Sequence, residues 1–323
     1  MRIKALLAIA AFFCSTLGFA QDYPRKPIAL VVPAAPGGAT DIIGRVMAEE
    51  LSKRLKQPAV VENKAGASGM LGTQAVARAA PDGYTLLLAY STPIFYAHHM
   101  FAKVPYDVKR DLDFISQVAS TSVVLFVHKD VPAKNMKEFI AWAQQNKGRI
   151  SYGSYGVGTA GHLMSAYLSQ SRDLGMAHVA YKSEAPLAQD VSGGVVPWGI
   201  GTLGPSLPHI KSGRTRAIAV MADKRLPDLP DVPTMAEQGF KDPEFKTIAW
   251  FTLLAPAGTP PEIVARLEKE ARAVAASTPM KARFQVYGLE GVGSTGEQLR
   301  RDLDATGPII EKLVNISGAR TDN

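Results

Sequence analysis

The chain has 323 residues, a formal net charge of +7 and a single cysteine, Cys14. Its Lys and Arg residues are scattered, and no basic run carries interleaved aromatic side chains, so the composition argues against a nucleic acid partner. A chain of this length can form two domains with well-filled cores and does not need disulfide bonds to hold them together.

The first twenty residues have the features of a secretory signal peptide. Arg2 and Lys4 are basic, residues 5–13 form an apolar run too short to span a bilayer, and small residues precede the end of the segment at Ala20. We expect cleavage after about Ala20 and export of the mature chain. That chain would have no cysteine and a charge of +5, because two basic residues leave with the peptide.

Alternating apolar runs and helical patterns then predict an α/β fold. Residues 28–32, 59–61 and 84–89 have the pattern of strands, and the apolar spacing of residues 42–55 indicates a helix between the first two. This strand–helix–strand order is typical of a parallel sheet covered by helices.

The same order begins again in the second half of the chain. Asn135 with Glu138 and Ser294 with Glu297 have the spacing of helix-start capping boxes, and Pro261 marks another helix start. Strands are predicted at 123–127, 150–152, 217–220 and 250–254.

A glycine loop connects the first predicted strand to its helix within VVPAAPGGATDII, residues 31–43. It lacks the Lys-Ser/Thr pair of a nucleotide P-loop. Free N–H groups at a helix N-terminus attract anions, so Gly37, Gly38 and Thr40 form a candidate anion site. Asp41 could cap the helix instead of facing a ligand, and a plain tight turn is the alternative reading of the whole loop.

A second loop contains the G-x-G-x-x-G spacing of dinucleotide sites at Gly156, Gly158 and Gly161. This spacing supplies an alternative function, that of a dinucleotide-dependent oxidoreductase. However, the loop lies mid-chain, and the downstream acids Asp173 and Glu184 miss the expected separation of about 20 residues.

The second loop is better interpreted as another helix N-terminus, which offers Ser154, Gly158 and Thr159 to an anion. His162 starts the following helix and could touch this site, although a single histidine is more often structural. The sequence contains no nucleophile elbow and no calcium loop. We therefore expect no catalytic residue, no metal and no cofactor.

A series of short motifs runs along nearly the whole mature chain. They are VP and PGG within residues 32–38, VENKAG (61–66), PDGYTLLL (81–88), SYGVGTAGHL (154–163), HVAYKS (178–183), LPDVPTMAEQG (229–239) and APAGTP (255–260). In these motifs and in their order, the chain resembles the tripartite tricarboxylate transporter substrate-binding proteins, the Bug-type family of periplasmic solute receptors.

The resemblance implies a two-domain, type II periplasmic-binding-protein architecture that closes like a flytrap, each domain a mostly parallel sheet flanked by helices. One domain would comprise residues 21–124 and 247–323, and the other residues 125–246, with crossings at 123–127 and 250–254. It also implies a periplasmic monomer that serves a membrane permease or a sensor.

The implied ligand is a small organic carboxylate, with one carboxylate at the first loop and the remainder of the ligand at the second. The ligand-binding candidates carried over from the family are Pro36, Gly37, Gly38, Thr40, Asp41, Ser91, Ser154, Gly158, Thr159 and Ala160.

Three positions are candidates for specificity, and two of them, Ala34 and Gly201, depart from the family pattern. Ala34 stands where relatives often carry an aromatic residue, which leaves room beside the first loop. An acid that meets an ammonium group in amino-acid-binding relatives would fall at Gly201, so we expect a ligand without a free amine. Trp198 is a candidate ligand contact.

Overall fold

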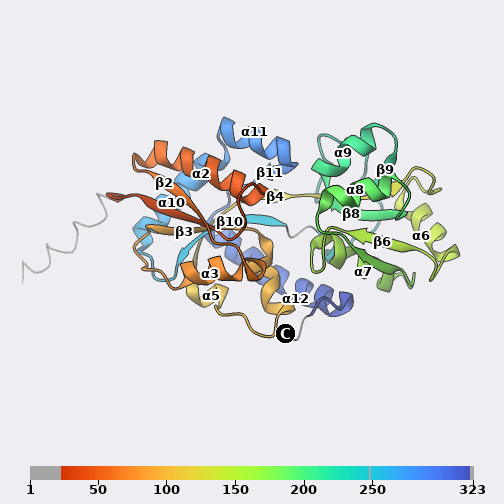
Figure 1. The fold of residues 1–323 in the computed structure, drawn as a ribbon, viewed down its shortest axis with the longest axis horizontal. Helices are drawn as coiled ribbons and strands as arrows, with labels where there is room; N and C mark the ends of the chain where they lie inside the picture. The colour runs from red at the N-terminus through yellow and green to blue at the C-terminus, as the bar shows by residue number, and fades with distance from the viewer. Residues whose placement is uncertain (1–22, 247–248, 321–323) are drawn as a thin grey trace, which may run out of the picture.

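The computed structural model describes residues 23–246 and 249–320, which form two sheets with helices on both faces of each (Figure 1). The predicted signal peptide lies outside these residues. Within the described ranges, no helix combines the length and hydropathy needed to cross a bilayer. The two helix-covered sheets confirm the α/β architecture expected from the sequence.

The first sheet has the strand order β11-β4-β10-β3-β1-β2. Strands β1 to β4 run in one direction and β10 and β11 in the other. The strands are β1 (Ile28–Val32), β2 (Ala59–Asn63), β3 (Thr85–Ala89), β4 (Leu112–Thr121), β10 (Trp250–Pro256) and β11 (Leu289–Gly291).

Strand β1 contributes apolar side chains to both faces of this sheet, and each face packs against helices. Successive side chains of a strand point to opposite faces. Leu30 packs in the cluster formed with α2, α10 and α11, whereas Val31 belongs to the cluster that includes α3 and α12. The helices associated with this sheet are α2 (Ala39–Leu55), α3 (Met70–Ala77), α4 (Ala97–Met100), α5 (Val108–Asp111), α10 (Pro261–Ala275), α11 (Thr278–Tyr287) and α12 (Gly296–Ser317), with short helical turns η2 (Ala67–Gly69) and η3 (Thr92–Tyr96).

The second sheet has the order β7-β6-β8-β5-β9, in which only β5 runs against its neighbours. Phe126 of β5 packs toward α8, and Leu125 packs on the opposite face toward α6 and α7. The elements are β5 (Val123–His128), α6 (Met136–Gln145), β6 (Ser151–Ser154), α7 (Ala160–Ser171), β7 (Ala177–Ala180), α8 (Glu184–Ser192), β8 (Trp198–Thr202), α9 (Leu203–Lys211) and β9 (Thr215–Met221), followed by η4 (Pro243–Phe245).

The chain passes between the sheets at two adjacent places. It leaves β4 at Thr121 and enters β5 at Val123, and it returns to the first sheet at β10, which begins at Trp250. The N–H of Thr121 donates to the carbonyl of Ala249 at 2.8 Å, so the two crossings are hydrogen-bonded to each other. The crossings therefore fall at the ends of the strands predicted to make them, not within those strands.

Helix α12 contacts both sheet units (Figure 1). Its Leu299 and Leu303 lie in the same apolar cluster as Phe114 of β4, and its Leu313 and Val314 share that cluster with α7. The C-terminal helix thus packs across the boundary between the two units.

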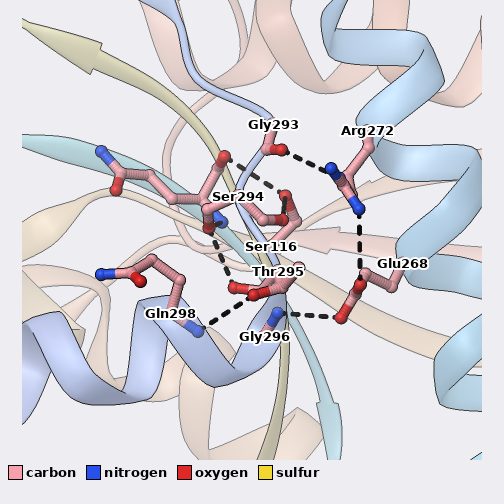
Figure 2. Close-up of polar contacts among 9 residues, drawn as sticks. Ser116, Glu268, Arg272, Gly293, Ser294, Thr295, Gly296 and Gln298 are labelled. Atoms are coloured by element: carbon pink, nitrogen blue, oxygen red, sulfur yellow. Dashed lines mark hydrogen bonds and ion pairs between the residues drawn. The ribbon is translucent and has the colours of Figure 1, made fainter.

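The start of α12 is fixed by a polar network on β4 and α10 (Figure 2). Ser294 Oγ accepts from the N–H of Gln117 at 2.9 Å, and Ser116 Oγ donates to the carbonyl of Ser294 at 2.8 Å. Glu268 of α10 accepts from the N–H of Gly296 at 2.9 Å. These bonds join three segments that are far apart in the sequence.

The two predicted capping boxes have different outcomes. Asn135 does cap α6, because its side chain accepts from the N–H of Glu138 at 2.9 Å. The prediction of Ser294 as a cap is wrong by one residue: Thr295 is the N-cap of α12 and accepts from the N–H of Gln298. Ser294 instead forms hydrogen bonds with Ser116 and Gln117 of β4.

Gly296 provides a stability test, because a Cβ at this position would lie 2.0 Å from the carbonyl oxygen of Phe114. We expect Gly296→Ala to lower the free energy of unfolding by about 2 kcal/mol or more in urea titrations, through steric overlap with β4. The matched control is Gly307→Ala in the same helix, where a Cβ meets nothing within 4 Å. It should change stability by less than about 1 kcal/mol; equal losses in both variants would contradict the packing argument.

Candidate binding cleft

Two adjoining cavities lie between the sheets, beside the strand crossings. The smaller measures about 130 Å³, and Ser91, which precedes η3 in the first unit, shares its wall with Thr159 and Ala160 at the start of α7 in the second. The larger measures about 360 Å³ and reaches Ala39 at the start of α2. Both cavities include Thr121, Thr202, Phe251 and Glu184 in their walls, so they form one continuous cleft.

The first glycine loop runs from the end of β1 to the start of α2. Gly37 has a φ of +87°, which glycine adopts without strain, and Gly38 is the N-cap in an extended conformation with no side-chain cap. Pro36, Gly37 and Gly38 are exposed. Because Ala39 lines the larger cavity, the N-terminus of α2 opens toward the cleft.

Asp41 fixes this loop from behind. Its carboxylate accepts from the N–H of Gly37 at 2.8 Å, from Arg45 Nε at 3.0 Å and from Asn63 Nδ2 at 2.9 Å. Asn63 Nδ2 also donates to the carbonyl of Ala34 at 3.1 Å. Burial alone would raise the pKa of the Asp41 carboxyl, but these hydrogen bonds hold it below its ordinary value.

Asp41 is only 2 % exposed, and both of its oxygens are engaged. This placement makes it a positioning residue and differs from the expected ligand contact. The side chain of Thr40 is also buried. Sequence reasoning missed Arg45 and Asn63 as supports of the loop. Their signals were the four-residue spacing from Asp41 to Arg45 and the Asn of the VENKAG motif.

Ser91 connects the cleft wall to a crossing strand. Its Oγ accepts from the N–H of Trp250 at 2.6 Å and donates to the carbonyl of Trp250 at 3.3 Å. The Trp250 ring in turn meets Phe95 edge to face, with centroids 4.8 Å apart. Ser91 therefore lies both in the cleft and at the start of β10.

The second glycine loop joins β6 to α7 and is held by its own hydroxyl groups. Ser154 Oγ accepts from the N–H of Gly156 and donates to its carbonyl. Thr159 is the N-cap of α7 and donates to the carbonyl of Gly156 at 2.7 Å. Ser154 is fully buried, so it supports the loop, whereas Thr159 and Ala160 line the cleft.

Gly158 is directed away from the cleft. Its N–H donates to His162 Nδ1 at 3.1 Å, and a Cβ at this position would lie 2.1 Å from Met100 Cε of α4. The loop therefore touches the first unit through Gly158, and the N–H expected to bind a ligand is used by His162.

Two stacked imidazole rings contact the second glycine loop at Ser154 and Gly158. His162 and His178 lie with centroids 3.8 Å apart and an angle of 9° between their planes. His178 Nε2 is 2.7 Å from Ser154 Oγ. Burial and then the neighbouring His178 lower the pKa of His162 to about 4, and burial also lowers the pKa of His178. Both rings are therefore neutral near pH 7 and hold the two ends of the loop.

None of the three specificity candidates is among the residues that line the two cleft cavities. Trp198 is fully buried and packs on Phe139 and Tyr152, which gives it a core role that differs from the expected ligand contact. A side chain at Gly201 would contact Phe126 and Leu187. The lack of an acid at Gly201 therefore says little about the ligand, and the expectation of an amine-free ligand loses its basis. The third candidate, Ala34, is partly buried against the core of the first unit.

A larger cavity of about 740 Å³ shares Thr121 and Trp250 with the cleft but is lined by β4 and α12. Neither glycine loop contributes to it. Its lysines are paired, Lys224 with Glu290 and Lys246 with Asp223. The cavity beside the two helix N-termini is thus the better candidate site.

The comparisons with known proteins agree over most of the chain. A family model described as "Tripartite tricarboxylate transporter family receptor" matches residues 43–314. Protein BugT of Bordetella pertussis is 35% identical over 306 residues, which cover 93% of each chain.

Solved structures give the same result. A Rhodopseudomonas palustris protein with adipate is 31% identical with a TM-score of 0.75, covering 92% of this chain and 99% of that one. MatC from the same organism, with bound malate, is 28% identical with a TM-score of 0.72, covering 90% and 100%. These similarities confirm the resemblance inferred from the motifs and the two-domain architecture.

The Asp41 network predicts a loss of stability when its acceptor is removed. Asp41→Ala leaves the N–H of Gly37 and the side chain of Asn63 without their shared partner, so we expect the free energy of unfolding to fall by about 1–3 kcal/mol. Hydrogen exchange at Gly37 should also accelerate. Glu49→Ala, on the exposed face of the same helix, is the control and should stay within about 0.5 kcal/mol of the parent. An Asp41→Ala variant with the same free energy of unfolding as the parent would contradict the role of Asp41 in holding the loop.

The histidine stack predicts a pH dependence. The folded protein keeps His162 neutral down to about pH 4, whereas the unfolded chain protonates it near its ordinary pKa of 6.5. Its contribution to stability is therefore complete above that value and is lost as the pH falls toward 4. We expect about 2 kcal/mol of loss from this residue between pH 7 and pH 4.5, measured by denaturant titration.

His162→Gln should remove most of this dependence, while His98→Gln, which changes an exposed histidine of α4, should keep most of it. A His162→Gln protein with the full pH dependence of the parent would show that the stack does not control it.

Proposed function

Since this chain belongs to the tripartite tricarboxylate transporter receptor family, we propose that it is a periplasmic receptor that captures a small organic carboxylate in the cleft between its sheets. The observation that carries this proposal is the meeting of two helix N-termini at the cleft, α2 through Ala39 and α7 through Ala160. Their N–H groups favour an anion and need no cationic side chain.

The chemistry of the cleft wall supports binding without reaction. Among the described residues that line the two cleft cavities there is no Lys, Arg, His or Cys. Hydroxyl groups of Ser91, Thr92, Thr121, Thr159 and Thr202 supply the polar surface instead. Such a wall can orient a carboxylate by hydrogen bonds, and its described residues include no Cys, His or Lys to act as nucleophile or base.

The ligand would lie between the exposed first loop and the N-terminus of α7. Pro36, Gly37 and Gly38 flank the start of α2 and would approach the carboxylate when the cleft is occupied. Thr159 and Ala160 would meet the other end. In this proposal Asp41, Ser154 and Gly158 hold the loops in shape and do not touch the ligand.

The division into sheets supports a flytrap of two domains, residues 21–124 with 247–323 and residues 125–246. The first group contains the whole first sheet, and the second group contains the second sheet except for Val123 and Val124 at the start of β5. The crossings beside Thr121 and Ala249 would form the hinge. The exception is α12, which also packs against α7.

The protein would act as a monomer after cleavage at about Ala20 and would deliver its ligand to a membrane transporter or to a sensor. The structures solved with adipate and malate support a carboxylate with few carbon atoms as the ligand. The dinucleotide reading of Gly156, Gly158 and Gly161 is the competing function.

A thermal-shift and calorimetric panel on the mature protein tests the proposal. Mono- and dicarboxylates of three to six carbons are compared with NAD. A cognate carboxylate at 100 times its Kd should stabilise the folded state by about 2.7 kcal/mol, and small-angle scattering should show a smaller radius of gyration. Ser91→Ala should weaken binding about tenfold, whereas Ser192→Ala, at the last residue of α8 and outside both cleft cavities, should not.

Tight binding of NAD with no response to any carboxylate would reject the receptor function and favour the dinucleotide-dependent oxidoreductase. Carboxylate binding with an unchanged radius of gyration would support the receptor function but reject closure about the proposed hinge.

A further inference from the structure

Glu184 is the one charged side chain among the described residues that line the two cleft cavities. It lies in the wall of both, together with Thr121, Thr202 and Phe251, and so marks the place where the cavities join. A ligand that fills the cleft has to pass beside this carboxyl group.

The local structure holds Glu184 in place without neutralising it. It is the first residue of α8, after the extended N-cap Ser183. Burial has the largest effect on the pKa of its carboxyl and raises it, whereas its own backbone N–H and the Thr202 hydroxyl lower it, and no basic residue contributes. Because a carboxylate has about four acceptor positions, capacity remains for a donor on the ligand.

Burial raises the pKa of Glu184, and the same carboxyl raises the pKa of the nearby Tyr155 hydroxyl, after the larger effect of burial. The field of Glu184 therefore reaches across the cleft wall. A second ligand carboxylate at this place would meet a like charge with no cation beside it, whereas a hydroxyl or ammonium group would find an acceptor.

We propose that Glu184 determines the ligand class, so that the cleft selects carboxylates whose far end carries a hydrogen-bond donor over dicarboxylates of the same length. This inference rests on the proposed receptor function. Glu184 lines the cleft. A side chain at Gly201, by contrast, would face Phe126 and Leu187.

Matched ligands test the inference by calorimetry on the mature protein. The pairs are 4-hydroxybutanoate and 4-aminobutanoate against succinate, and 6-hydroxyhexanoate and 6-aminohexanoate against adipate. In at least one chain length, a donor-bearing ligand should bind more than about tenfold tighter than the dicarboxylate. The hydroxy and amino arms distinguish which donor is preferred.

The variant Glu184→Gln keeps the shape and removes the charge, so it should reduce this preference to below about threefold. Glu184→Ser is a second variant with the same expected direction, should the amide disturb folding. The control is Glu262→Gln, an exposed acid in the first turn of α10, which should keep the parent's preference.

Two results would overturn the inference while leaving the receptor intact: a parent protein that prefers the dicarboxylates, or a preference that both Glu184 variants retain. If no carboxylate binds the parent protein at all, the receptor function fails, and the inference fails with it.

Discussion

The cleft depends on main-chain N–H groups being held in fixed directions, because the described residues of its walls offer no basic side chain to an anion. Each loop meets this constraint with the same device. The N–H of Gly37 donates to Asp41, and the N–H of Gly158 donates to His162, in both cases four residues further on and inside the following helix. Both glycines have positive φ values, +87° and +73°. The side chain therefore turns one N–H of the loop back toward the helix and sets the direction of the groups that follow.

The side chain that accepts the glycine N–H is an anion in the first loop and a neutral ring in the second, so the two loops respond differently to pH. Asp41 is an anion that satisfies three donors, so its loop holds its geometry at any pH at which the carboxylate is ionised. His162 accepts only while its ring is neutral, and it stacks on His178, which contacts Ser154. The second loop therefore depends on His162 staying neutral, which the folded protein maintains down to about pH 4, whereas the first loop depends on Asp41 staying ionised.

Much of the fold could be predicted from apolar periodicity. The first strand, Ile28–Val32, was predicted at its observed bounds, and the start of α10 at Pro261 was signalled by that proline. Strands β4, β7, β8 and β11 were not predicted. β7 has no fully buried residue and β11 is very short, so neither has a strong alternating pattern, and Gly199 and Gly201 interrupt that of β8. The N-cap of α12 was displaced because a tertiary partner, β4, uses the hydroxyl of Ser294.

The site was predictable at the level of loops but not of individual side chains. The glycines located both helix N-termini, since the conformations they allow are local. Whether Asp41 faces a ligand or caps its own loop is decided by Asn63, 22 residues away, and no local pattern contains that information. Glu184 entered the sequence argument only as an acid at the wrong spacing for a dinucleotide, yet the fold places it in the cleft wall.

Helix α12 has a consequence for the energetics of any opening and closing motion. Since it packs against β4 in one unit and α7 in the other, part of its apolar surface is buried by each unit, and a movement of one unit relative to the other would change how much of that surface stays buried. The observed affinity of a receptor is its intrinsic affinity scaled by the population of the binding-competent arrangement. If the units move as the proposed hinge requires, substitutions at Leu313 or Val314, which line neither cleft cavity, would thus tune affinity through that population and leave the chemistry of recognition untouched.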